Sequence, residues 1–299
     1  MRKRSPFSDF LPWLGLFVPL NIASAEDLPV PFTEEAVQRG IMYFVHQGWF
    51  DGDGSFGCGM VLSDLDGDDL PDFLCTGAMN GIVGLYRNIG DGQFESVTDS
   101  GIDRMYAASG VSAADYDGDG DLDLFFTNWL APDVLYRNEG QMHFTDVTTS
   151  SGITGTDGAG AGSSWCDFDK DGDLDLYVAN RTGTQGSDVR NQFWVNGGNG
   201  TFEDAAGAYG IDGDAATMQP AWFDYDGDGW VDLYLSTDKG GTGESSNRLF
   251  RNMLGFTFVD VSDQSGTGVG IDSMGVAIGD LDCNEEPDIY CTNVPSGNP

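Results

Sequence analysis

Histidine, positive charge and long apolar segments are all scarce in this chain of 299 residues. Only His46 and His143 are present, at unrelated positions, so a histidine-based catalytic pair or zinc site has little to build on. The chain has 13 basic residues against 49 acidic ones, which gives a formal charge of −36. Nucleic-acid binding depends on basic patches, so this composition argues against nucleic acid as a partner.

The one marked apolar run lies at the start of the chain. A basic stretch (residues 2–4) precedes an apolar segment (residues 10–20), and Ala23-Ser24-Ala25 follows it. This order predicts a secretory signal peptide over residues 1–25. An uncleaved anchor is the alternative, but the run is shorter than the ~20 residues needed to span a bilayer. We therefore expect a mature protein that is secreted, periplasmic or at the cell surface, and that does not span the membrane.

Cysteine is also rare, and its count of five is odd. In an exported chain this leaves at least one thiol free or paired outside the chain. Cys58 and Cys75 lie on neighbouring predicted strands and form the favoured disulfide pair. By contrast, 40% hydrophobic residues and 44 glycines provide for a core and for many tight turns, which is typical of short strands.

What the sequence has in abundance is an acidic loop of nine residues. In residues 115–123, carboxylates occupy positions one, three, five and nine, and glycine occupies position six. Alternate side chains then point at one centre, the sixth residue allows a sharp turn, and the seventh offers a backbone carbonyl, as in a calcium site. Near-copies follow spacings of 51, 52, 57 and 56 residues, with loops beginning at Asp64, Asp115, Asp167, Asp224 and Asp280.

About half of all acidic residues lie in these five loops. Several carboxylates in one turn repel each other unless a cation neutralises them. An acidic turn that never binds metal is the alternative, and five copies in register count against it. The sequence therefore predicts five calcium sites.

Each repeat shows the same order of parts. A glycine-rich segment (residues 110–114) leads into the loop, and an apolar run (residues 122–126) follows. An aromatic-x-Asn element (residues 136–138) and a Phe-led segment (residues 144–148) complete the unit. Four short strands in about 50 residues predict an all-β fold, a β-propeller of four-stranded blades. The acidic loop should join the first two strands, and an Asn-x-Gly turn with positive φ at Asn and Gly should join the last two.

The two ends of the repeat array are incomplete. Residues 32–41 match the fourth-strand element, whereas residues 275–291 supply only two strands and a loop. Either a five-bladed ring closes imperfectly, or residues 26–299 are the front part of a longer, seven-bladed propeller that is truncated at the C-terminus. We favour the second interpretation.

The Asp-x-Asp-x-Asp-Gly-x-x-Asp loops, Tyr-Arg-Asn-x-Gly turns and Phe-x-Asp-Val-Thr endings resemble the FG-GAP/VCBS repeat family over about residues 30–299. They are most similar to its secreted branch of the cartilage acidic protein and ASPIC/UnbV type. The resemblance implies an integrin α-like propeller with structural Ca²⁺ in its blade loops. The implied side-chain ligands are Asp64, Asp66, Asp68 and Asp72; Asp115, Asp117, Asp119 and Asp123; Asp167, Asp169, Asp171 and Asp175; Asp224, Asp226, Asp228 and Asp232; and Asp280, Asp282, Asn284 and Asp288.

Two loops depart from the family pattern. Asp69 and Glu285 stand at position six, where glycine is expected, and Asn284 is a neutral ligand. Asp adopts the left-handed conformation more readily than Glu. We therefore expect the fifth site to be the weakest.

These features favour an exported calcium-binding propeller that serves as a protein- or glycan-binding adhesion module. Because no acid, base or nucleophile accompanies the loops, we expect no enzyme activity and a structural role for calcium. The alternative is a propeller-type polysaccharide lyase or hydrolase with structural calcium. Its only support is a set of scattered cations: Arg181, Arg190, Lys239 and Arg248.

Two insertions and three tryptophans are candidates for a binding face. The third and fourth repeats carry polar, glycine-rich insertions at residues 181–190 and 239–247. Loops on a rigid scaffold often bind ligands, although slack connections are equally compatible with this composition. Trp49, Trp129 and Trp230 lie at irregular positions and are the better candidates for a sugar platform, whereas the other aromatics recur as expected for blade packing.

Overall fold

The computed structural model describes residues 34–43, 59–77, 81–103, 108–128, 131–154, 160–181, 190–213, 216–238 and 246–293. The chain divides into compact units at residues 1–35 and 36–299, and every element named below belongs to the second unit. Its strands, in chain order, are β1 (Met60–Ser63), β2 (Asp72–Cys75), β3 (Gly84–Asn88), β4 (Phe94–Ser96), β5 (Ala108–Ala114), β6 (Asp123–Asn128), β7 (Val134–Asn138), β8 (Phe144–Asp146), β9 (Gly160–Cys166), β10 (Asp175–Asn180), β11 (Gln192–Asn196), β12 (Phe202–Asp204), β13 (Thr217–Phe223), β14 (Asp232–Thr237), β15 (Arg248–Asn252), β16 (Phe258–Asp260), β17 (Ser273–Gly279) and β18 (Asp288–Asn293). Two single-turn helices are α1 (Ala206–Tyr209) and α2 (Ser262–Ser265).

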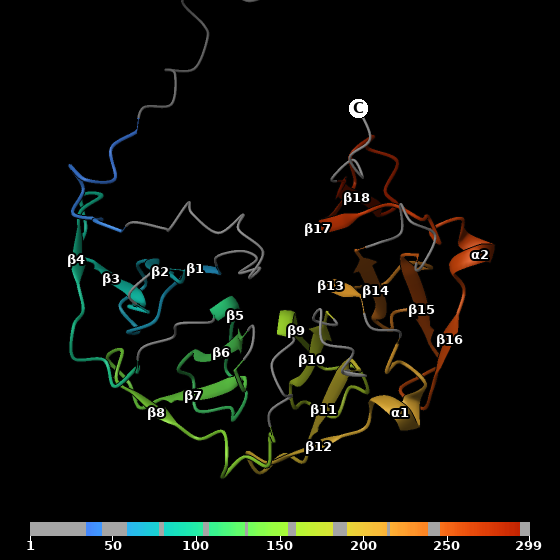
Figure 1. Cartoon of the computed structure of the whole chain (residues 1–299), viewed down its shortest axis with the longest axis horizontal. Helices are drawn as coiled ribbons and strands as arrows, with labels where there is room; N and C mark the ends of the chain where they lie inside the picture. The colour runs from blue at the N-terminus through green and yellow to red at the C-terminus, as the bar shows by residue number, and fades with distance from the viewer. Residues whose placement is uncertain are drawn as a thin grey trace, which may run out of the picture. The chain divides into compact units, whose positions relative to one another are not determined.

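These strands form five antiparallel sheets, which we number one to five along the chain (Figure 1). Sheets one to four each contain four consecutive strands that pair in chain order: β1–β4, β5–β8, β9–β12 and β13–β16. Sheet five consists of β17 and β18. The structure thus confirms the predicted all-β class and the four-stranded repeat unit.

The second strand of each inner sheet is buried on both faces. Every residue of β6, β10 and β14 is buried, because neighbouring sheets cover both sides. The first strands of successive sheets contact each other in order, from β1 against β5 to β13 against β17. This explains why the runs after the acidic loops are continuously apolar and do not alternate.

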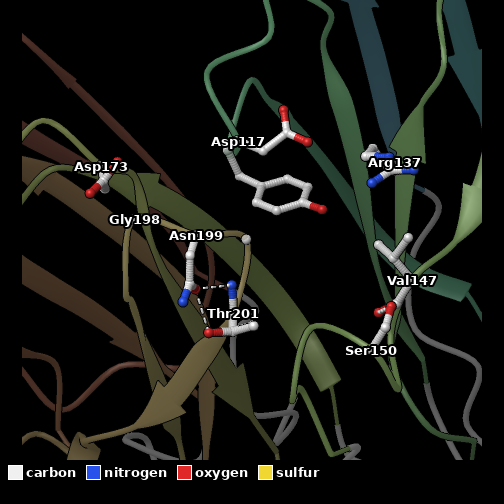
Figure 2. A pocket seen from close by; sticks show the side chains of 10 residues that line it. Asp117, Arg137, Val147, Ser150, Asp173, Gly198, Asn199 and Thr201 are labelled. Atoms are coloured by element: carbon white, nitrogen blue, oxygen red, sulfur yellow. Dashed lines mark hydrogen bonds between the residues drawn. The ribbon is translucent and has the colours of Figure 1, made fainter.

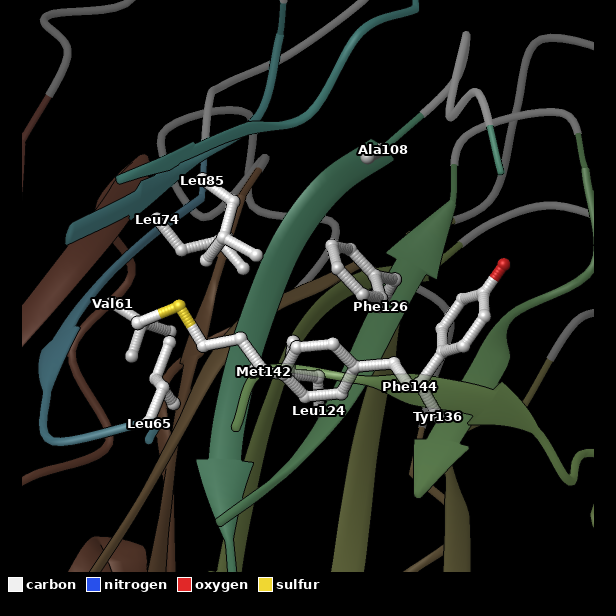
Figure 3. Close-up of a cluster of buried hydrophobic side chains, with 10 residues drawn as sticks. All are labelled: Val61, Leu65, Leu74, Leu85, Ala108, Leu124, Phe126, Tyr136, Met142 and Phe144. Atoms are coloured by element: carbon white, nitrogen blue, oxygen red, sulfur yellow. The ribbon is translucent and has the colours of Figure 1, made fainter. Parts of the chain in front are cut away.

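The core lies in layers between successive sheets. Between sheets one and two, Leu74 and Leu85 face Leu124 and Phe126 (Figure 3). Met142 enters the same cluster from the turn between β7 and β8 and is fully buried. Similar clusters lie between sheets two and three, three and four, and four and five. Each blade is therefore stabilised mainly by its neighbours.

The predicted fourth-strand element near the N-terminus is present in part. Residues 36–41 form the turn that follows a fourth strand in the other repeats. The Phe94 N–H donates to the Arg39 carbonyl at 2.7 Å, and the Phe144 N–H donates to the Ser100 carbonyl at the same distance. Residues 36–41 therefore contact sheet one in the same way that the segment after β4 contacts sheet two. The first residues of the element lie outside the described residues.

Several predictions concern parts of the chain that the structure does not describe, and they stay predictions. They are the signal peptide over residues 1–25, Cys58 of the favoured disulfide, Trp49, Trp129, Lys239, and residues 182–189 and 240–245 of the two insertions.

Candidate metal centres

Each acidic loop joins the first strand of a sheet to the second. In sheet two, Asp115 follows β5 directly and Asp123 is the first residue of β6. The other four loops have the same placement, with ninth-position residues Asp72, Asp175, Asp232 and Asp288 opening β2, β10, β14 and β18. Strand pairing therefore fixes both ends of every loop, as predicted.

The first aspartate organises the loop backbone. In loop four, Asp224 Oδ1 accepts hydrogen bonds from the N–H groups of Gly227 (2.8 Å) and Asp228 (3.1 Å). Its Oδ2 accepts one from Gly229 at 2.8 Å. Loop one repeats this pattern around Asp64. The backbone of the loop thus folds around this carboxylate, whose charge lies at the centre of the loop.

Position six has a positive φ in all five loops, including the two that lack glycine. Asp69 has φ 68° and Glu285 has φ 70°, against 86° to 98° for the three glycines. Position four is also left-handed, at Lys170 (φ 62°) and Cys283 (φ 63°) as well as at three glycines. Sequence reasoning missed this second turn, although glycine at position four in three loops was a usable signal. Non-glycine residues at these positions carry a local cost of about 1–2 kcal/mol.

Each loop brings three carboxylates together. In every loop the residues at positions one, three and nine offer oxygen atoms that lie within 4.8 Å of one another. These groups are Asp64, Asp66 and Asp72; Asp115, Asp117 and Asp123; Asp167, Asp169 and Asp175; Asp224, Asp226 and Asp232; and Asp280, Asp282 and Asp288. The fifth-position residues lie outside these groups. Instead they accept the N–H of position seven, as Asp119 does from Asp121 at 2.9 Å.

The ninth carboxylate is buried and holds two strands to the loop. Asp123 Oδ2 accepts the N–H of Tyr116 at 3.2 Å, and its Oδ1 accepts the N–H of Asn138 at 2.8 Å. Burial raises the pKa of Asp123 to about 7; the charges of Asp117 and Asp119 act in the same direction, and the two N–H donors oppose them. A side chain with no exposed surface therefore carries a charge that its surroundings only partly stabilise.

The same arrangement recurs in sheets one, three and four. The ninth aspartate accepts the N–H of loop position two and of the third-strand asparagine in each: Asp72 from Leu65 and Asn88, Asp175 from Phe168 and Asn196, and Asp232 from Tyr225 and Asn252. Burial is again the largest cause of a raised pKa, to about 7 for Asp175 and about 6 for Asp232.

The asparagine of the third strand links neighbouring blades. Asn196 Nδ2 donates to the carbonyl of Tyr116 in the preceding loop at 2.9 Å, and its Oδ1 accepts the N–H of Gly198 at 3.1 Å. The prediction of a positive φ at this asparagine was wrong, because Gly198 (φ 70°) provides the left-handed residue. The equivalent Asn138 and Asn252 also reach the loop of the preceding sheet.

An arginine on the third strand provides a positive charge near some loops. Arg87 pairs with Asp66 at 2.6 Å, and Arg251 pairs with Asp226 at 2.7 Å. Arg137 pairs instead with Glu139. Sequence reasoning missed this role, because the Tyr-Arg-Asn element reads as an ordinary strand end.

The loops fit a hard divalent cation. Their donors are carboxylate and carbonyl oxygens, which suit Ca²⁺. Asp66 Oδ1 and Asp167 Oδ1 are buried and have no hydrogen-bond partner among the described residues. Such unsatisfied acceptors next to two further carboxylates are what a bound cation would satisfy. The described part of the chain therefore has five groups of acidic residues that could hold a metal.

The remaining candidates lie apart from the loops' centres. Trp230, at position seven of loop four, has the Lys170 ammonium 4.3 Å from its ring centroid. Of the four basic residues proposed for an enzyme, the three that the structure describes each pair with a different acid: Arg181 with Asp238, Arg190 with Asp212, and Arg248 with Asp260. None of the helices in the described part of the chain has the length and apolar character of a membrane span.

The link between blades can be tested at Asn196. Replacing Asn196 with Asp keeps the shape but removes the Nδ2 donor, so the Tyr116 and Leu174 carbonyls lose a partner and a second carboxylate faces Asp175. We expect Asn196→Asp to lower the free energy of unfolding by about 1–3 kcal/mol in urea titrations. Asn199→Asp, on the exposed tip of the same turn, should change it by less than about 0.5 kcal/mol. Equal effects of the two variants would contradict the link.

Comparisons with known proteins agree with these repeats. Three overlapping segments match the model of the FG-GAP-like repeat: residues 64–126, 115–178 and 167–235. Cartilage acidic protein 1 of Xenopus tropicalis is 29% identical over 203 residues, which is 60% of this chain and 28% of that protein. Its counterpart in Mus musculus is 26% identical over 212 residues, 67% of this chain and 31% of that protein. This chain thus spans less than a third of the length of these relatives.

Among solved structures, the V. cholerae biofilm matrix protein Bap1 aligns with a TM-score of 0.42 and 17% identity, over 79% of this chain and 34% of Bap1. FG-GAP-like repeats folded as four-stranded antiparallel blades define a β-propeller class. Because the three matches together cover residues 64–235, more than half of the chain, this protein belongs to the FG-GAP-like repeat family.

Proposed function

We propose that this chain is an exported propeller module that binds a protein or a glycan and whose blades are stabilised by calcium. The calcium is structural: it neutralises the loops and has no part in a reaction. Export is supported by the signal-like residues 1–25, and calcium is abundant outside the cytoplasm, where even millimolar sites fill.

One observation carries this proposal: five loops each gather three carboxylates within 4.8 Å, and four of the five ninth carboxylates are buried. Three like charges at this separation repel strongly, and burial adds a desolvation cost. A divalent cation offsets both. The residues that would hold it are those at positions one, three and nine, with the fifth side chain and the seventh carbonyl as further oxygen donors.

The binding role rests on which parts of the sequence vary between repeats. The strands and loops are constant from blade to blade, whereas the third-to-fourth-strand turns and the two insertions differ. Variable segments held by a rigid scaffold are where recognition usually resides. The proposal for protein or glycan ligands therefore concerns these segments.

Calcium removal tests the structural role. With Ca²⁺ at a hundredfold excess over Kd, each filled site adds about 2.7 kcal/mol to the free energy of unfolding. We expect calorimetry of the mature chain to show a melting temperature at least roughly 10 °C higher in calcium than in chelator.

A pair of variants locates this effect in the loops. Asp115→Asn removes a carboxylate from a group of three, and the gain in melting temperature on adding calcium should fall by about one fifth if the five sites contribute equally. Asp121→Asn removes the same charge from position seven of the same loop, outside the group, and should leave the gain unchanged. An identical melting temperature with and without calcium would refute the structural role.

The raised pKa values predict that the melting temperature of the metal-free protein falls as the pH rises, unlike that of the calcium-loaded protein. Asp123 and Asp175 have a pKa of about 7 in the folded chain, against an ordinary value of 3.8, so the folded state binds more protons than the unfolded state between about pH 4 and 7. Their contribution to stability is therefore complete below pH 3.8 and is lost as the pH rises to 7. Metal-free protein should melt at progressively lower temperature over this range. Calcium-loaded protein should not, because calcium binds the deprotonated loops; parallel curves would contradict this.

A glycan array and an array of extracellular-matrix proteins, each run with calcium and with chelator, test the binding role. We expect ligand retention that is lost in chelator, and no new reducing ends or unsaturated sugars when the retained glycans are incubated with the protein. Turnover of a retained glycan would replace the binding module with a lyase or hydrolase.

A further inference from the structure

The turn between the third and fourth strands packs against the preceding sheet, and its fourth residue after the asparagine differs between blades. In sheet two this residue is Met142, which is fully buried between sheets one and two (Figure 3). In sheet three the equivalent residue is Gly200, four residues after Asn196 and two before Phe202. The side chain that closes one interface is therefore missing from the next.

The two residues share a left-handed backbone conformation, although the turns around them differ. Met142 has φ 59° and Gly200 has φ 75°, so both are left-handed. A Cβ atom added at Gly200 would meet only a ring atom of Tyr116, at 3.9 Å. The residue before them differs, because Gln141 has φ 56° whereas Asn199 is not left-handed. The blades therefore differ in the conformation of the turn as well as in the side chain at this position.

A cavity of about 360 Å³ opens at this place, between sheets two and three (Figure 2). Its lining comes from loops two and three, from β7 and the segment after β8, and from the turn of sheet three. The lining residues that matter for recognition are Tyr116, Asp117, Arg137, Ser150, Asp173 and Thr201. By contrast, the matching position beside sheet one is filled, since a Cβ on Gly92 would lie 2.0 Å from the Arg39 guanidinium.

Two charged groups of the lining do not pair with each other. In sheets one and four the third-strand arginine pairs with the third-position aspartate, as Arg87 does with Asp66. In sheet two Arg137 pairs with Glu139 at 2.6 Å, and Asp117 has no ion pair among the described residues. Figure 2 shows the Asp117 and Arg137 side chains as separate groups of the lining. The cavity therefore offers a separated acceptor and donor.

The lining combines carboxylate acceptors, guanidinium donors and hydroxyls that both donate and accept. An anionic ligand would meet Asp117 and Asp173, and a lysine or arginine side chain would meet the guanidinium of Arg137. With the proposed cation on loop two, the charge of Asp117 is offset and the lining becomes close to neutral. This pattern suits a neutral ligand with several hydroxyl groups, and the volume is that of one or two sugar rings.

We infer that the cavity at Gly200 is a subsite for one neutral hexose unit of a glycan. Asp117, Arg137 and the hydroxyls of Ser150 and Thr201 would bind the sugar hydroxyls. This inference rests on the proposed function, because it specifies the glycan and requires a cation to offset Asp117.

The sister blade provides the test. Gly200→Met introduces the residue that sheet two accepts in the same left-handed conformation, and it should fill the cavity without disturbing the fold. Gly207→Met adds the same side chain in α1 of the same blade, where nothing lies within 4 Å of the added Cβ. Saturation-transfer NMR in calcium, with the methyl glycosides of glucose, galactose and mannose, measures binding. We expect binding of at least one glycoside by the wild type and by Gly207→Met, and at least a tenfold weaker affinity for Gly200→Met.

The outcomes separate this inference from the proposed function. Equal binding by Gly200→Met and the wild type, or no transfer to any glycoside from the wild type, overturns the subsite. Neither result affects the calcium-dependent melting and array binding that test the proposed function. Binding of N-acetyl-lysine amide by the wild type, abolished in Gly200→Met, also overturns it, because the cavity would then accept a basic side chain of a protein. Melting temperatures of all three proteins in calcium establish that each is folded.

Discussion

A buried carboxylate at the start of the second strand in sheets one to four is the constraint on which these blades depend. Asp123 joins three segments at once: its own strand, the loop backbone at Tyr116 and the third strand at Asn138. Two backbone N–H donors only partly stabilise a negative charge in a site without exposed surface. The pKa of Asp123 is therefore raised to about 7. The group is best stabilised by a proton or by a cation. The side chain that holds the strands of the blade together is therefore also the one that needs a proton or a cation.

This constraint passes from blade to blade through the asparagine. Asp175 accepts the Asn196 N–H, and Asn196 in turn donates its side-chain N–H to the Tyr116 carbonyl of the preceding loop. Tyr116 is itself fixed by Asp123. A chain of hydrogen bonds thus connects successive loops, in addition to the apolar layers between sheets. In a repeat protein whose units contact mainly their neighbours, such a link makes the order of one loop depend on the next.

The sequence predicted the parts of this arrangement that are local. Loop positions, strand order and the left-handed sixth residue all follow from spacing within about fifty residues, because turns and short strands are decided by nearby residues. It did not predict that Asn196 reaches Tyr116, 80 positions away, or that Arg87 faces Asp66. These contacts depend on how blades stack, and a Tyr-Arg-Asn strand end carries no local sign of them.

The empty place at Gly200 was hidden for a related reason. A glycine in a turn normally indicates a need for positive φ, and Gly200 has one. Only the sister blade shows that the conformation does not require glycine, because Met142 adopts it with a side chain. Because a positive φ does not by itself require glycine at this position, the volume of the absent side chain becomes the relevant difference. Repeats with the same strand order can therefore be compared position by position: residues common to all blades maintain the fold, and a side chain that one blade lacks identifies where the interface between two blades differs.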